Sequence, residues 1–184
     1  MLISGKKTFL SSSFLASSKC YIHDRKSKSW RLHASMSTVR SSYASATIHG
    51  GLWLIGGTDD KWSNLKSTEI VFSNGSVVKG PDLPTPRSGH CAVDLLDGRI
   101  MIIGGKPNTK NVIMYNSVDG SFSPAPSLLF EKVDSACTLF HSPMHDHRLV
   151  VLVAGSEDHA NDVYGASALL DFTDPTAVWK QSEL

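Results

Sequence analysis

Short apolar runs that end in glycine recur along this chain at a nearly constant interval. The runs are GLWLIGG, RIMIIGG and LVVLVAG, which end at Gly57, Gly105 and Gly155, so the steps are 48 and 50 residues. Apolar runs of this length suit strands that are covered on both faces and need not alternate. A glycine pair lets the backbone leave such a strand with positive φ and pass close to neighbouring chain. The spacing predicts a repeated β-unit of about fifty residues.

Four longer segments share a second pattern, in which an apolar strand runs into a polar turn and then toward a large apolar residue. The segments are KCYIHDRKSKSW, STEIVFSNGSVV, NVIMYNSVDGSF and LLDFTDPTAVW. Three of them place a ring seven residues before the final aromatic: His23 and Trp30, Tyr115 and Phe122, and Phe172 and Trp179. The second segment, with Phe72 and Val77, departs from that spacing. The pattern predicts four hairpins.

A cation stands at a matching place in three of the units. Each lies ten residues after the last bulky residue of a hairpin and precedes another alternating stretch: Arg40, Arg87 and Lys132. Turn residues such as Asn74 and Gly75 separate the stretches where the chain must reverse. A full unit is therefore four short strands, which is one blade of a β-propeller.

The double glycine, the aromatic seven residues before a Trp, and the period near fifty together resemble Kelch repeats. The resemblance runs from about Lys19 to Trp179, with Ala154 replacing a first glycine and Val77 replacing a Trp. It implies an all-β fold, an incomplete Kelch-type β-propeller of about three and a half repeats. The predicted boundaries are an irregular basic, Ser-rich start or remnant strand at 1–18, a partial N-terminal blade at 19–36, and three full four-stranded blades at 37–81, 82–126 and 127–184.

Propellers typically close with four to eight blades, so this number of repeats falls short of a circle. Open sheet edges and uncovered blade faces would expose hydrogen-bonding groups and apolar surface. We therefore expect the chain to be part of a longer product, to associate with another chain, including a second copy that completes the propeller, or to be marginally stable.

Composition narrows the class of protein. Apolar residues make up 41% and charged residues 19%, which is typical of a folded globular protein, and no apolar run is long enough to cross a membrane. The three cysteines have no metal-ligand spacing, so we expect buried free thiols and a cytoplasmic location. Residues 1–40 hold eight Lys and Arg against Asp24 alone. This start is compatible with a transit peptide, but KTFLSSSFLA favours a damaged strand of the first blade.

The candidate binding residues lie in the loops that join the second strand to the third, and each blade to the next. Such loops emerge on one face of a propeller built this way. Trp62 stands in a polar loop and is interpreted as an exposed anchor for a partner, with packing on its own blade as the alternative. Arg40 and Arg87 could bind acidic groups bidentately, with structural bonds to backbone carbonyls as the alternative.

The remaining candidates are loop residues that could contact a peptide or a cation, with solvated loop charges as the alternative: Asp59, Asp60, Lys106, Glu157, Asp158 and His159. The segment HSPMHDH brings three histidines together but is interpreted as a surface loop rather than a zinc or copper site. No arrangement of nucleophile, base and acid is present, so the sequence predicts no catalytic residue, metal or cofactor.

The resemblance implies a protein-interaction module that binds a protein or peptide partner through its propeller loops. It is similar to the substrate-recognition propellers of ubiquitin-ligase adaptors and to actin-associated Kelch proteins, neither of which would make it an enzyme or a nucleic-acid binder. Two alternatives stay open. One is a fragment of a sugar oxidase or a sialic-acid mutarotase-like propeller enzyme, and the other is a structural fragment of a longer Kelch protein.

Overall fold

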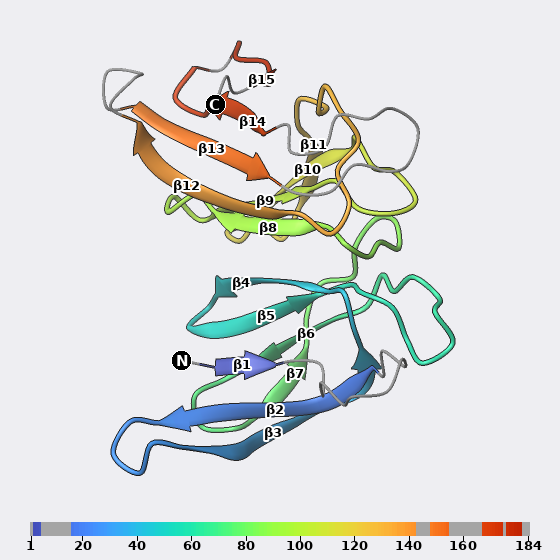
Figure 1. The fold of residues 1–184 in the computed structure, drawn as a ribbon, viewed down its shortest axis with the longest axis vertical. Coiled ribbons are helices and arrows are strands. Elements are labelled where there is room, and N and C mark those ends of the chain that lie inside the picture. Colours follow the sequence, from blue (N-terminus) through green and yellow to red (C-terminus); the bar gives the residue numbers. More distant parts are fainter. Residues whose placement is uncertain (1, 5–15, 143–147, 155–166, 175, 182–184) are drawn as a thin grey trace. The chain divides into compact units, whose positions relative to one another are not determined.

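The computed structural model describes residues 2–4, 16–142, 148–154, 167–174 and 176–181. These residues form antiparallel β-sheets joined by turns, and no helix occurs among them, so the predicted all-β class is confirmed (Figure 1). The chain divides into two compact units, Met1–Pro86 and Arg87–Leu184.

Unit 1 holds two sheets. The first has three strands in the order β1 (Leu2–Ser4), β2 (Ser17–Asp24) and β3 (Ser29–Arg40), and the second has four, β4 (Ala44–Ile48), β5 (Gly51–Ile55), β6 (Thr68–Val71) and β7 (Val77–Lys79). β3 runs across the predicted boundary between residues 36 and 37. The proposed damaged strand in KTFLSSSFLA lies almost wholly outside the described residues.

Unit 2 holds two four-stranded sheets. One contains β8 (Cys91–Asp94), β9 (Arg99–Ile103), β10 (Val112–Asn116) and β11 (Phe122–Pro124), and the other contains β12 (Ala136–Ser142), β13 (Arg148–Ala154), β14 (Ala168–Asp171) and β15 (Lys180–Gln181). In every sheet with four strands, neighbours along the chain are neighbours in the sheet. That is the strand order the repeat predicts for a blade.

The apolar runs that end in glycine are the second strands of their sheets and supply much of each core. In β5, residues 53–55 are fully buried, and in β9, residues 100–103 are at most 2% exposed. A strand with both faces buried has no polar side to alternate with, which is why GLWLI and RIMII read as continuous apolar runs.

The glycines that end the first two runs are required by their backbone, and Gly155, which ends the third, lies outside the described residues. Gly57 and Gly105 have φ of 97° and 85°, where an L side chain is strained. A Cβ on Gly105 would also lie 2.6 Å from the Ser88 carbonyl oxygen, and one on Gly57 would clash with the Ser41 carbonyl. The predicted reason for the glycine pair, positive φ together with close backbone approach, is confirmed.

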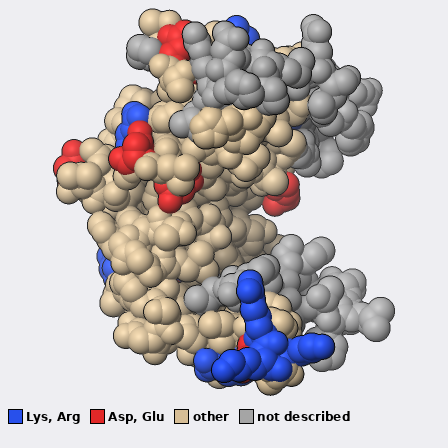
Figure 2. Space-filling model, turned by 90° about the vertical axis from the view of Figure 1, so that its left-hand side faces the viewer, with Lys and Arg blue, Asp and Glu red and all other residues tan. Residues whose placement is uncertain are grey.

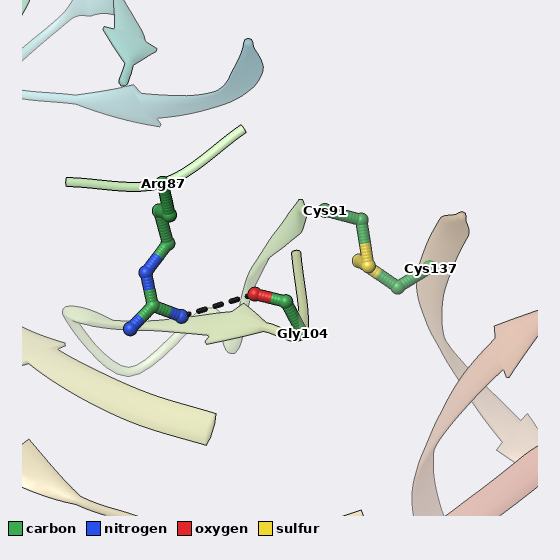
Figure 3. The surroundings of a disulfide bond; sticks show 4 residues. All are labelled: Arg87, Cys91, Gly104 and Cys137. Carbon is green, nitrogen blue, oxygen red and sulfur yellow. Dashed lines mark hydrogen bonds between the residues drawn. A yellow bond between two sulfur atoms is a disulfide. The ribbon is translucent and has the colours of Figure 1, made fainter. Parts of the chain in front are cut away.

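A disulfide joins two sheets of unit 2. Cys91 on β8 and Cys137 on β12 are paired, with their Cα atoms 5.9 Å apart (Figure 3). The expectation of buried thiols outside any disulfide was therefore wrong for these two residues and holds for Cys20, which is buried and takes part in no disulfide. The sequence signal failed because these two cysteines come from different repeats, 46 residues apart.

Candidate functional site

Arg40, at the end of β3, is buried inside unit 1 rather than presented to a partner. The residue is 2% exposed, and Nη1 donates hydrogen bonds to the carbonyls of Gly56 at 2.7 Å and Ser67 at 3.0 Å. Nη2 donates to Glu69 Oε1 at 2.9 Å. These contacts support the alternative of a structural role, because the guanidinium bonds the backbone that leaves β5 and approaches β6.

The Glu69 carboxylate completes this buried network. Besides the bond from Arg40, it accepts the backbone N–H groups of Ser37 at 2.7 Å and Thr38 at 3.1 Å. Burial acts to raise the pKa of Glu69, but the bonds from Ser37, Arg40 and Thr38 outweigh it and hold the pKa below its ordinary value. Sequence reasoning missed Glu69, although an acid inside the apolar strand TEIV is the signal that could have found it.

Arg87 occupies the same place in unit 2. It is 2% exposed, and it donates to the Gly104 carbonyl at 3.2 Å (Figure 3). It also donates to Asn111 Oδ1 at 2.6 Å. Burial lowers the pKa of Arg87 to about 10, which leaves the group charged at neutral pH. In both units the arginine donates to the carbonyl of the first glycine of the pair. Two repeats of this chain therefore share the same structural bond at the end of their second strand.

Trp62 lies in the loop between β5 and β6 and is 64% exposed. Its backbone has φ of 64°, which is uncommon for a bulky residue, and its N–H donates to the Asp59 carbonyl at 3.3 Å. The alternative that Trp62 packs on its own blade is not what the structure shows, because about two-thirds of the side chain faces solvent.

Asp59 holds the turn from which Trp62 projects. Its carboxylate accepts the backbone N–H groups of Lys61 at 2.9 Å and Ser63 at 2.8 Å, and its own N–H donates to the Ser63 carbonyl at 3.1 Å. Asp59 is accordingly half-buried, whereas Asp60 and Lys61 beside it are exposed. The carboxylate of Asp59 therefore orders the loop, and Asp60 with Trp62 forms its outer surface.

The other predicted site residues divide between unit 2 and the part of the chain that is not described. Lys106 has an exposed side chain, and its backbone is bridged to Ser88 by two hydrogen bonds of 2.9 and 3.2 Å. Glu157, Asp158 and His159 lie outside the described residues. Within unit 1, the structure brings Asp59, Asp60 and Trp62 into one loop and places Arg40 in the interior.

A hollow of about 480 Å³ opens in unit 1 between β3, β6 and β7. Residues 35–38, 67–69 and 77–79 line it, and the carboxylate of Glu69, one of these residues, already accepts the hydrogen bonds described above. Within the ranges that the structure covers, no group of three or more His, Cys, Asp or Glu residues is arranged to hold a metal. Nor does that part of the chain contain a helix able to span a membrane.

Comparison with known proteins relates the sheets of this chain to those of β-propellers. No family model matches the chain. Beta-scruin of Limulus polyphemus is 26% identical over 120 residues, which is 61% of this chain and 13% of Beta-scruin. The solved structure of YjhT aligns with a TM-score of 0.67 and 16% identity, covering 90% of this chain and 59% of the YjhT chain.

These similarities establish the architecture more firmly than the family. The chain spans a small part of Beta-scruin and less than two-thirds of YjhT. Together with the antiparallel four-stranded sheets, the likeness shows the fold of an incomplete Kelch-type propeller. The two matches support a Kelch-type family and leave the number of repeats open.

Proposed function

We propose that this chain is a protein-interaction module that binds a peptide or a loop of another protein through the segment TDDKWSN, residues 58–64. The observation that carries this proposal is the exposed indole of Trp62, 64% exposed on a loop whose turn is fixed by Asp59. Trp is among the residues that most often dominate binding energy at protein interfaces.

The loop is organised before binding. Two backbone N–H groups are bonded to the Asp59 carboxylate, and Leu65 N–H donates to the Gly57 carbonyl at 2.8 Å, which closes the loop at its base. A loop already ordered loses less conformational entropy when it binds, so more of the contact energy contributes to affinity. Asp60, two residues before Trp62 in the same loop, is exposed as well, which favours a partner segment that joins an apolar side chain to a basic one.

Selection from a phage-displayed random peptide library tests this function directly. Peptides selected on the wild-type chain are measured by calorimetry against wild type and Trp62→Ser, and we expect the variant to lose at least about 30-fold in affinity, the effect of removing an interface hot spot. Leu96→Ser is the matched control, because Leu96 is 77% exposed with φ of 65°, and it lies in the β8–β9 turn. Peptides that bind all three proteins equally would contradict the proposal.

A further inference from the structure

The aromatic residue that ends a hairpin is buried in one repeat and exposed to solvent in another. In unit 2, Trp179 is 1% exposed, and its indole N–H donates to the Pro126 carbonyl at 2.8 Å, on the loop after the preceding sheet. In unit 1, the equivalent Trp30 contacts the tilted ring of His23 with ring centroids 5.0 Å apart, yet it remains 50% exposed. Its indole N–H has no hydrogen-bond partner among the described residues.

Strand alternation shows which face Trp30 occupies. Cys20, Ala34 and Met36 point toward the second sheet of unit 1, where they share a core cluster with Leu54 and Val71. Successive side chains of a strand point to opposite faces, so Cys20 and His23, three residues apart on β2, lie on opposite faces. The register pairs Cys20 with Ala34 and His23 with Trp30, and it skips His33, which shifts the alternation of β3 by one residue between the two pairs. The face with Trp30 is therefore the one turned away from the second sheet. Leu32, 52% exposed, lies on the same face.

The last sheet of unit 2 has the complementary arrangement. Cys137, Val151 and Ala168 point into the core cluster shared with the sheet β8–β11. The opposite face carries three apolar side chains that are only half-buried, Phe140, Leu152 and Leu169, of which Leu152 and Leu169 are directly paired. Each unit thus has one apolar sheet face that a neighbouring blade would cover in a closed propeller.

Charge distinguishes the two units and makes them complementary. Residues 1–86 contain 11 Lys and Arg against 5 Asp and Glu, whereas residues 87–184 contain 7 against 12. Four exposed cations lie beside Trp30 on the β2–β3 hairpin, where Figure 2 shows Lys and Arg gathered: Arg25, Lys26, Lys28 and Arg31. Net charges of +6 and −5 attract unit 1 of one copy to unit 2 of another and oppose contacts between like units.

We infer that this chain self-associates head to tail, with the Trp30 face of unit 1 docking on the Phe140 face of unit 2 in a second copy. In this contact, Trp30 packs on a blade of another copy in the way that Trp179 packs on the preceding blade of its own chain. It is a heterologous contact, which forms a ring if the rotation closes. The surface is distinct from the Trp62 loop, so the inference does not depend on the proposed function.

Light scattering and sedimentation equilibrium of the full chain over a range of concentrations test the inference. Wild type should rise above its 19.9 kDa mass as concentration increases. Trp30→Ser and Phe140→Lys should each weaken association by at least about 30-fold, while Trp62→Ser should match wild type. Raising the salt from about 0.15 M to about 1 M should also weaken association, because the Debye length falls from about 8 Å to about 3 Å.

Mixing the two variants gives the decisive measurement. Trp30→Ser keeps an intact Phe140 face and Phe140→Lys keeps an intact Trp30 face, so an equimolar mixture should form a dimer that neither variant forms alone. Circular dichroism checks that each variant is folded, and Leu169→Lys replaces Phe140→Lys if that variant is not. If wild type stays at 19.9 kDa at every concentration, the inference is overturned. That result is the one expected if a different protein covers the face. Association of Phe140→Lys with wild-type strength also overturns it, because two Trp30 faces would then meet each other.

Discussion

Replacing Glu69 with Leu tests whether the buried arginine network holds unit 1 together. In the folded protein, Arg40 and Glu69 form an ion pair at 2.9 Å, with their side chains 0% and 5% exposed. The Glu69→Leu variant has a side chain of similar size, but it leaves the guanidinium without its counter-charge. It also leaves the N–H groups of Ser37 and Thr38 without an acceptor.

The expected cost is a large part of the stability of a small domain. Removing one partner of a buried pair typically costs about 3–5 kcal/mol, because the other charge stays buried and uncompensated. The bonds from Arg40 to the carbonyls of Gly56 and Ser67 remain and keep the cost within that range. Since whole domains are stable by about 5–15 kcal/mol, the variant should be near the limit of folding.

Urea unfolding followed by tryptophan fluorescence provides the assay, because Trp53 is fully buried in unit 1. The double variant Arg40→Met with Glu69→Leu should recover part of the loss, since it removes the unpaired charge. Lys79→Met is the control in the same unit: Lys79 pairs with Asp82 at 3.3 Å with 73% of its side chain exposed, and its loss should cost less than about 1 kcal/mol.

The pH dependence of the same variants gives a second readout. The pKa of Glu69 is lower in the folded protein than its ordinary value of 4.5, so its contribution is complete above that pH. It is lost as the pH falls through the folded-state value, and the gap between wild type and Glu69→Leu should shrink there. A loss below about 1 kcal/mol at neutral pH, or a double variant no more stable than Glu69→Leu, would refute the reasoning.

Two further perturbations test the backbone and the disulfide of unit 2. Gly105→Ala combines φ of 85° with a Cβ 2.6 Å from the Ser88 carbonyl oxygen, and should destabilise by more than Gly120→Ala, where φ is 73° but no atom lies within 4 Å. Strain alone accounts for about 1–2 kcal/mol, so equal urea midpoints for the two variants would show that the close approach is unimportant. Reducing the Cys91–Cys137 bond, which closes a loop of 46 residues, should lower stability by up to about 4 kcal/mol. An unchanged melting temperature in reductant would contradict that estimate.

The sequence was sufficient for the fold because the signals that define a blade are local. A run such as RIMII, a glycine pair and a hairpin turn each occupy fewer than ten residues, and each has one physical reading: two buried faces, a positive φ, and a chain reversal. Their recurrence near every fifty residues predicted sheets that the structure confirms. The disulfide lay beyond this reasoning, because it depends on the distance between strands of different blades.

The candidate site was harder to predict because a sequence does not show whether a polar group is already satisfied. Arg40 and Trp62 both looked available for a partner from their positions in loops. The structure buries the first against Gly56, Ser67 and Glu69 and leaves the second in solvent. The difference lies in carbonyls and a carboxylate that approach Arg40 from other strands.

The four tryptophans show the same dependence on tertiary contacts and indicate what decides the role of an aromatic residue in a repeat protein. Trp53 and Trp179 are buried, the latter in the core cluster of unit 2 with its indole N–H bonded to the Pro126 carbonyl, whereas Trp62 and Trp30 are 64% and 50% exposed. Trp30 and Trp179 hold the same place in the repeat, so the repeat pattern cannot account for their different exposure. Repeats interact with their neighbours, so the role of such a residue depends on the surface that covers it.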